Sequence, residues 1–173
     1  HPMDVARTAV SMMGLEDKET SNSSPEANMR KALRIFSKTP TALAAFYRIR
    51  SDKKIIKPKK SLSFSENFFY MCFGKVPQKE IVKAFDVSLI LYAEHSFNVS
   101  TFTARTITSS LSDIHGAITG AIASLKGPLH GGANEEVMHM MKKIKKPANA
   151  LKWINNALKN KDVVMGFGHR VYK

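Results

Sequence analysis

The sequence Ser124-Leu-Lys-Gly-Pro-Leu-His-Gly-Gly-Ala-Asn134 joins two segments that we expect to be helical. Small residues before it predict a helix that ends near Lys126, and we expect Asn134 to cap the next helix. Pro128 fixes the backbone ahead of His130, and the flanking glycines let another backbone or a ligand approach closely. This pattern is typical of a turn that holds one imidazole at a site.

The composition is that of an ordinary globular protein with an excess of positive charge. The chain has 173 residues, 43% of them hydrophobic, and a net charge of +13. Seven of the 27 basic residues lie in 48–60 and nine in 142–173. Such concentrated charge attracts the phosphates of a nucleic acid or of a nucleotide cofactor. Solvated lysines on loops and helix faces are the alternative interpretation.

The single cysteine, Cys72, excludes an intramolecular disulfide and fits a reducing compartment. Its phenylalanine, tyrosine and methionine neighbours favour a buried, inert thiol. The longest apolar run, 114–125, is too short to cross a bilayer. We therefore expect no membrane association and a cytoplasmic, bacterial-like location, with the mitochondrial matrix as the alternative.

Capping residues and apolar periodicity predict an all-α chain. The expected helices are 4–13, one from Ser24, another from Thr39 to about Ile49, 64–73, 77–92, 98–111, 113–125, 134–143 and 147–160. In the last of these we expect Leu151, Ile154 and Leu158 to form a buried stripe. In 113–125, Gly116, Gly120 and Ser124 share one face, which favours close packing either within the chain or between subunits.

Three of the six histidines are candidates for chemistry: His95 at a helix end, His130, and His169 after Gly-Phe-Gly. We interpret His115 and His139 as satisfied helix-face residues. The sequence has no Cys-x-x-Cys or His-Glu-x-x-His metal spacing, nucleotide-binding loop or nucleophile elbow, so we expect neither a metal nor a covalent nucleophile. Glycine-framed imidazoles beside basic segments fit polarisation of carbonyls and binding of an anionic substrate.

Three motifs resemble the citrate synthase family in order and spacing: 93–105, 124–135 and 166–173. The opening His-Pro-Met-Asp-Val-Ala-Arg-Thr matches as well, so the resemblance covers essentially the whole chain. Within the family, 85–98 looks more like 2-methylcitrate synthases. The resemblance implies an all-α large domain that forms a homodimer, to which 1–128 would belong, and a small helical domain that begins with 129–173. Both chain ends suggest cuts within a longer fold.

The family condenses an acyl-CoA with oxaloacetate and hydrolyses the resulting thioester, with CoA thioester as co-substrate and no permanently bound cofactor. By motif match, His130 would hydrogen-bond the thioester carbonyl and His169 would polarise the ketone of oxaloacetate. His95 and Asn98 would hold oxaloacetate. The CoA site would be lined by Val163, Val164, Met165, Gly166, Phe167 and Gly168. One preplaced donor to a developing oxyanion contributes roughly 3–4 kcal/mol.

One departure limits the expected activity. The catalytic base of the family is an aspartate well downstream of the Gly-Phe-Gly-His motif, and the only acid after Glu136 is Asp162. We therefore expect the 173-residue chain to be inactive by itself. For the whole enzyme we favour propionyl-CoA, with acetyl-CoA as the alternative. A basic helical module for nucleic acid is a third hypothesis. The absence of aromatics from 48–60 counts against it, and it would leave the glycine-framed histidines unexplained.

Overall fold

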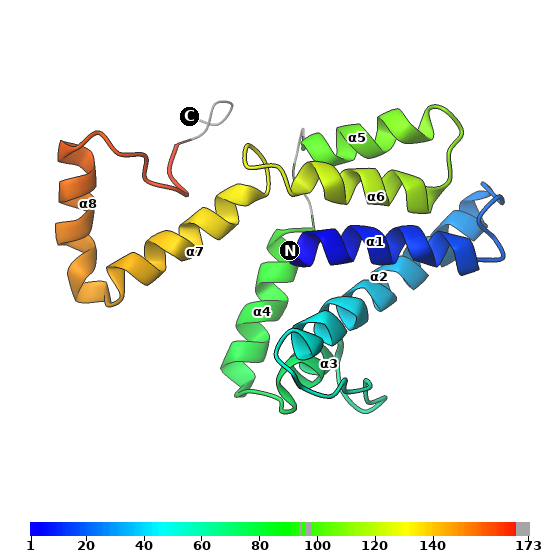
Figure 1. Cartoon of the computed structure of the whole chain (residues 1–173), viewed down its shortest axis with the longest axis horizontal. Coiled ribbons are helices and arrows are strands. Elements are labelled where there is room, and N and C mark those ends of the chain that lie inside the picture. Colours follow the sequence, from blue (N-terminus) through cyan, green and yellow to red (C-terminus); the bar gives the residue numbers. More distant parts are fainter. Residues whose placement is uncertain (94, 96–97, 169–173) are drawn as a thin grey trace. The chain divides into compact units, whose positions relative to one another are not determined.

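The computed structural model describes residues 1–93, 95 and 98–168, and all regular structure in that part is helical (Figure 1). The elements are α1 (Pro2–Glu16), α2 (Pro25–Ile49), α3 (Phe64–Phe73), α4 (Lys79–Leu91), α5 (Val99–Thr108), α6 (Ile114–Leu125), α7 (Gly132–Ile144), the 3-10 turn η1 (Pro147–Asn149) and α8 (Ala150–Lys159). The predicted all-α class is confirmed. No helix of the described ranges is both long enough and apolar enough to cross a bilayer.

The contacts divide the chain into two units, His1–Ser124 and Leu125–Lys173. We describe each unit by itself. The first contains α1 to α5 and nearly all of α6, and the second contains α7, η1 and α8. The predicted assignment of 1–128 and 129–173 to a large and a small domain stays a prediction.

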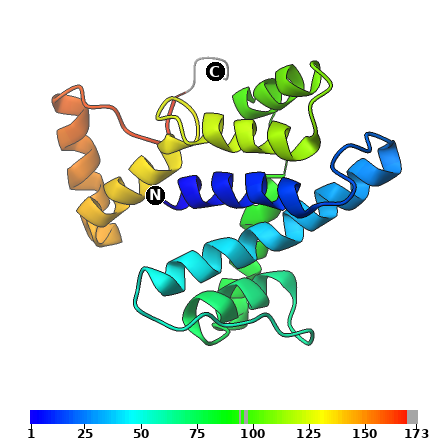
Figure 2. The ribbon, with the colours of Figure 1, turned by 45° about the vertical axis from the view of Figure 1, so that its right-hand side comes forward.

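The first layer of unit 1 is the packing of α1 against α2 (Figure 2). Val10 and Ala27 are fully buried on these helices. Lys31 is also fully buried, and its ammonium donates to the carbonyl oxygens of Thr20 and Asn22 at 3.2 and 2.7 Å. A buried charge is tolerated only when it is hydrogen-bonded. Lys31 therefore fixes the connection between α1 and α2.

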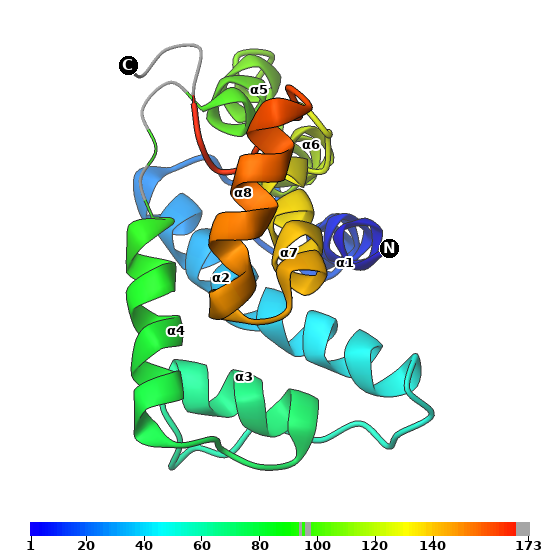
Figure 3. The same cartoon turned by 90° about the vertical axis from the view of Figure 1, so that its left-hand side faces the viewer.

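The second layer joins α2 to α3 and α3 to α4 (Figure 3). Ala44, Met71 and Cys72 form a buried apolar cluster. The ring of Phe85 on α4 stacks on Phe68 of α3, with 5.5 Å between ring centroids. The prediction of a buried Cys72 is confirmed, because its exposed fraction is 4%. Burial raises the pKa of the Cys72 thiol, which makes it a poor nucleophile at neutral pH.

The helix α3 has the bounds that the sequence predicts, and its two caps explain why. The Ser63 hydroxyl accepts from the Glu66 backbone N–H, while the Glu66 carboxylate accepts from the Ser63 N–H. At the other end Gly74 has φ +79°, a conformation that glycine adopts without strain. Both caps are formed by residues next to the helix in the sequence, so the sequence alone can indicate where the helix begins and ends.

The predicted break between two helices near Thr39 is wrong, because α2 continues through Pro40 where we expected a new helix. Pro40 has no N–H to donate to the preceding turn. The neighbouring Thr39 hydroxyl instead donates to the Ile35 carbonyl at 2.7 Å. The buried residues of α2 lie on both sides of the proline, at Ile35 and Ala44. Packing along the whole helix therefore outweighs the local preference for a break.

The pair α5 and α6 closes unit 1. The Asp113 carboxylate caps α6 by accepting from the Gly116 N–H at 2.9 Å. A Cβ placed on Gly120 would collide with the Ile107 side chain of α5. The small-residue face at Gly120 therefore serves a contact within the chain.

Unit 2 departs from the sequence prediction at both of its α-helices. The first, α7, begins at Gly132, so Asn134 lies inside the helix and does not cap it. In α8, Leu151 and Leu158 are 73% and 63% exposed, and the buried residue is Ala157. The predicted stripe is therefore not buried within the described part of unit 2.

Candidate active site

The backbone around His130 closes into a turn at the end of α6. The His130 N–H donates to the Gly127 carbonyl at 3.0 Å, and the Gly131 N–H donates to the Leu125 carbonyl at 3.0 Å. A third bond joins the Gly132 N–H to the Gly127 carbonyl at 3.2 Å. Three successive N–H groups thus point back into the turn. His130 is half-buried there, and Leu129 is fully exposed.

The first glycine after His130, Gly131, is needed for space. A Cβ on Gly131 would run into the carbonyl oxygen of Leu125, and one on Gly132 would come within 3.4 Å of the Gly127 oxygen. Gly131 has φ −73°, which other residues adopt as well. The sequence predicts that the glycines let another backbone segment or a ligand approach closely. At this turn, it is the backbone of Leu125 that approaches Gly131.

His95 and Asn98 lie in unit 1, just ahead of α5. Asn98 is the N-cap, and its side-chain oxygen accepts from the Thr101 N–H at 2.7 Å and the Ser100 hydroxyl at 2.8 Å. His95 is exposed three residues earlier. With its oxygen used in capping, Asn98 can offer a ligand the N–H groups of its amide. The N-terminus of α5 adds a positive electrostatic potential that favours an anion.

The predicted CoA-site segment, 163–168, follows α8 in unit 2. Gly166 and Gly168 have φ +90° and +77°, so both occupy conformations that favour glycine. Gly166 lies close to Val137 of α7, because an added Cβ would be 3.4 Å from the valine Cγ2. Phe167 is 73% exposed. The prediction for His169 lies outside the described residues.

The candidate residues therefore divide between the units. His95 and Asn98 both lie in unit 1, and Asn98 caps α5. His130 and 163–168 lie in unit 2, where the first precedes α7 and the second contacts it through Gly166. In the described part of the chain, no cluster of three or more His, Cys, Asp or Glu side chains could hold a metal ion.

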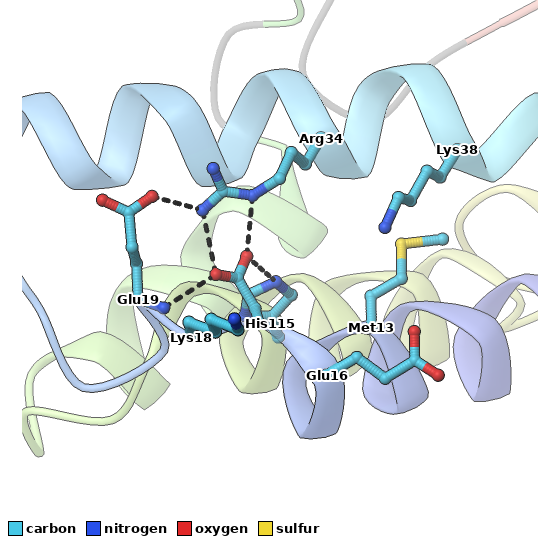
Figure 4. Close-up of a pocket in the computed structure, with 8 residues that line it drawn as sticks. Met13, Glu16, Lys18, Glu19, Arg34, Lys38 and His115 are labelled. Atoms are coloured by element: carbon cyan, nitrogen blue, oxygen red, sulfur yellow. Dashed lines mark hydrogen bonds and ion pairs between the residues drawn. The ribbon is translucent and has the colours of Figure 1, made fainter.

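Sequence reasoning missed a polar cluster around His115 (Figure 4). His115 is 2% exposed, with Nε2 3.5 Å from Asp17 Oδ2 and Nδ1 3.6 Å from Asp113 Oδ1. Neither ring nitrogen makes a hydrogen bond within the described ranges. The interpretation of His115 as satisfied was therefore wrong. His139 is exposed, and its Nδ1 lies 3.5 Å from Glu136.

Arg34 organises the carboxylates of this cluster. It donates to both oxygens of Asp17 at 2.9 Å and to Glu19 at 2.8 Å (Figure 4). Burial raises the pKa of Asp17, but the Glu19 N–H, the Arg34 guanidinium and the charge of His115 more than offset this and leave it below its ordinary value. Hydrogen bonds from Arg30 and Arg34 lower the pKa of Glu19 to about 2.

A cavity of about 290 Å³ adjoins the cluster. It is lined by Met13, Glu16, Asp17, Lys18, Glu19, Arg34, Lys38 and His115. None of the predicted site residues lines it. The sequence carries no local signal for this cluster, because Asp17, Arg34 and His115 are distant from one another along the chain.

Comparison with known proteins identifies the family to which the three motifs point. Residues 1–173 match the family described as citrate synthase, C-terminal domain. The chain is 53% identical over its full length to a citrate synthase of Mycolicibacterium smegmatis and covers 46% of it. It is 52% identical to the 2-methylcitrate synthase of Mycobacterium tuberculosis strain H37Rv and covers 44% of it.

A solved structure agrees in fold. The citrate synthase of Thermoplasma acidophilum, in a ternary complex with carboxymethyl coenzyme A and oxaloacetate, is 35% identical and gives a TM-score of 0.81 over 99% of this chain and 45% of that one. The chain therefore belongs to the citrate synthase family. It spans less than half the length of these relatives. The comparisons give no support to the nucleic-acid-binding alternative.

Proposed function

We propose that this chain is part of an enzyme that condenses an acyl-CoA with oxaloacetate and then hydrolyses the thioester of the product. The observation that carries the proposal is the family match over all 173 residues, in which the specific His130 motif forms a closed backbone turn. The turn supports the proposal because a reaction through an enolate needs a donor in a fixed position.

His130 is the proposed donor to the thioester carbonyl. Removal of a proton from the α-carbon places negative charge on this oxygen, and an imidazole N–H at hydrogen-bond distance stabilises that charge. The three backbone bonds that close the turn hold in place the main chain from which the imidazole extends. A donor held in advance avoids the cost of reorganisation during the reaction.

Oxaloacetate is the proposed ligand of His95 and Asn98, and His169 is proposed to polarise its ketone. The amide N–H groups of Asn98 and the N-terminal end of α5 both favour a carboxylate. The proposed CoA segment is 163–168, where two glycines with positive φ leave room for a ligand to approach the backbone. The lysines at the end of α7 and on α8 would attract the phosphates of CoA.

We favour propionyl-CoA as the acyl donor, which makes the product 2-methylcitrate. The alternative is acetyl-CoA with citrate as the product, and relatives with both names have nearly equal identity to the chain. One methylene in an apolar pocket changes binding by only about 1–3 kcal/mol. The measurement that decides is kcat/KM for each thioester, made on the enzyme that carries this chain. A higher value for acetyl-CoA would favour the alternative.

We further propose a homodimer formed by large-domain helices, with 1–128 in the large domain and 129–173 at the start of the small one. The Gly120 side of α6 is not proposed as the dimer contact, because α5 covers it. By itself the 173-residue chain is proposed to be inactive, since the aspartate base of the family lies downstream of the Gly-Phe-Gly-His motif and the last acid of this sequence, Asp162, precedes that motif. Release of CoA by the purified chain, in the presence of oxaloacetate, would contradict this.

The role of His130 is tested by His130→Ala in the enzyme that carries this chain. Loss of one oxyanion donor lowers kcat by about 10²–10³-fold. His139→Ala is the matched control, because it removes an exposed imidazole from the same unit. A kcat for His130→Ala within threefold of the control would overturn the proposed role.

A further inference from the structure

The basic segment 53–60 lies in the connection between α2 and α3 and runs along α3 (Figure 3). It contains five lysines and no acidic residue, and all five lysine side chains are exposed. Among the described residues, none of these lysines lies in an ion pair with a carboxylate. The segment is therefore a concentrated positive surface, and the proposed reaction gives it no role.

Two side chains hold the segment against the neighbouring helices. The Arg48 guanidinium donates to the Lys54 carbonyl at 2.8 Å. The Asn67 amide of α3 accepts from the Lys59 N–H and donates to the Lys59 carbonyl, both at 2.8 Å. The Lys59 ammonium also lies 4.4 Å from the centroid of the Tyr70 ring. The backbone is therefore held at Lys54 and at Lys59 before any partner binds.

The backbone between these two anchors is unpaired. From 53 to 59 the chain has no helix, turn or bend, so it runs in one direction without folding back. In the described part of the chain, the N–H and carbonyl groups of Ile55, Ile56 and Lys57 form no hydrogen bond. The Ile56 side chain is half-buried beside Gly74, whereas Ile55 is 56% exposed. Such an open run of backbone can pair with an added strand.

We propose that the basic segment 53–60 is a docking site for an extended acidic peptide of a partner protein, which adds to the unpaired backbone as a strand. Donors and acceptors alternate along a peptide, so it can satisfy both the N–H and the carbonyl groups of the segment. Carboxylates of the peptide pair with the exposed lysines, and the positive surface steers the peptide towards them. This inference does not depend on the proposed function, since no thioester or oxaloacetate takes part.

The chemistry of the segment disfavours two other occupants. The phosphates of a nucleic acid accept hydrogen bonds and cannot donate to the exposed carbonyl groups, and 48–60 has no aromatic ring on which a base could stack. A second copy of this chain would add a strand of the same positive charge, which repels. An acidic peptide fits both the charge and the unpaired backbone.

Fluorescence anisotropy of a labelled peptide of alternating threonine and glutamate, titrated with the 173-residue chain, tests the docking site. We expect saturable binding. Lys54→Gln with Lys57→Gln should lower the affinity by roughly 2–30-fold, because each exposed ion pair contributes modestly. Lys79→Gln with Lys83→Gln is the matched control, because it removes the same charge from exposed positions of α4, and it should bind as the unsubstituted chain does. Equal losses in the two variants, or no binding to the unsubstituted chain, would overturn the proposal.

Two further measurements separate strand addition from attraction of charge alone. The same peptide with a methyl group on every backbone nitrogen keeps its carboxylates but has no N–H to donate, so we expect it to bind roughly tenfold more weakly or less. Alternate amide protons within 55–57 should exchange with solvent more slowly when the unmethylated peptide is bound, because a strand pairs with alternate residues. Equal affinity for the methylated peptide, or unchanged exchange within 55–57, contradicts strand addition.

A single-stranded oligothymidine of the same charge is the probe for the nucleic-acid alternative. Both probes are compared at one salt concentration, because binding through charge depends on salt. We expect the acidic peptide to bind more tightly than the oligothymidine. Tighter binding of the oligothymidine would overturn the proposal and assign the segment to nucleic acid.

Discussion

Arg34 holds two carboxylates of the connection between α1 and α2 at once. Its guanidinium donates to Asp17 and to Glu19, and Arg30 also pairs with Glu19. The fixed fork of an arginine suits such planar, paired recognition better than a lysine would. The connection is therefore held by the ion pairs of Asp17 and Glu19 and by the hydrogen bonds that the buried Lys31 donates to its carbonyl groups.

The ion pairs of Glu19 predict that acid destabilises the fold. The pKa of Glu19 is lowered from 4.5 to about 2, so the folded chain favours its charged form. The resulting stability is present above pH 4.5 and is lost as the pH falls towards 2. Glu19→Gln should lower the Tm at pH 7 by no more than about 2–4 °C, because a partly exposed pair is screened by water.

The same experiment at low pH supplies the check. Between pH 4.5 and 2 the Tm of Glu19→Gln and that of the unsubstituted chain should converge. Glu16→Gln, which changes an exposed carboxylate at the end of α1, serves as the comparison. A difference for Glu19→Gln that is constant from pH 7 to pH 2 would contradict the predicted role of the ion pairs.

At the level of single residues, the sequence predicts the turn of His130 but not the environment of His115. The proline and glycines around His130 act on the backbone within a few residues, so their effect is visible in the sequence. His115 owes its environment to Asp17, which is brought to it only when α1 and α6 come together. A contact between distant segments has no local signature.

Helix ends follow the sequence where a cap acts locally. The bounds of α3 are as predicted, and the caps Ser63 and Gly74 account for them; Asp113 likewise caps α6. The prediction of a buried stripe on α8 is wrong for another reason. Periodicity says which residues share a face, whereas the exposure of Leu151 and Leu158 depends on what covers that face.

Pro40 provides a test at the level of the helix. Proline in a helix interior costs about 3 kcal/mol relative to alanine, part of which is recovered because it restricts the unfolded chain. Pro40→Ala restores an N–H to the middle of α2, so we expect it to stabilise the chain by roughly 1–3 kcal/mol. Denaturant unfolding gives this change in the free energy of unfolding.

Pro25→Ala is the matched control for this substitution. Pro25 occupies the first turn of the same helix, where no N–H is required within the helix. Its replacement should change the free energy of unfolding much less. If Pro40→Ala is destabilising while Pro25→Ala is neutral, the packing of the proline ring contributes more than the missing hydrogen bond costs.

Over the whole molecule, large apolar side chains remain exposed. At the end of α4, Ile90 and Leu91 are 72% and 73% exposed, and Phe102 of α5 is 70% exposed. Large apolar side chains that remain exposed favour association. The net charge of +13 opposes it by mutual repulsion, which salt screens.

We therefore predict that the isolated chain self-associates more strongly as salt is raised. Light scattering after size exclusion at about 50 mM and 500 mM salt measures the mass, and the larger mass should appear at the higher concentration. Ile90→Lys with Leu91→Lys should reduce the effect. Asn155→Lys adds positive charge at an exposed polar position and should not remove it. A monomer at both salt concentrations would contradict the prediction.

The contact between Gly131 and the Leu125 carbonyl has a consequence for how such sequences evolve. Any side chain at 131 would collide with the backbone at the end of α6. We therefore expect substitutions at this position to be rejected for a structural reason, whatever ligand binds nearby. Gly131 then reports on closure of the backbone turn, and ligand preference must be sought at other positions.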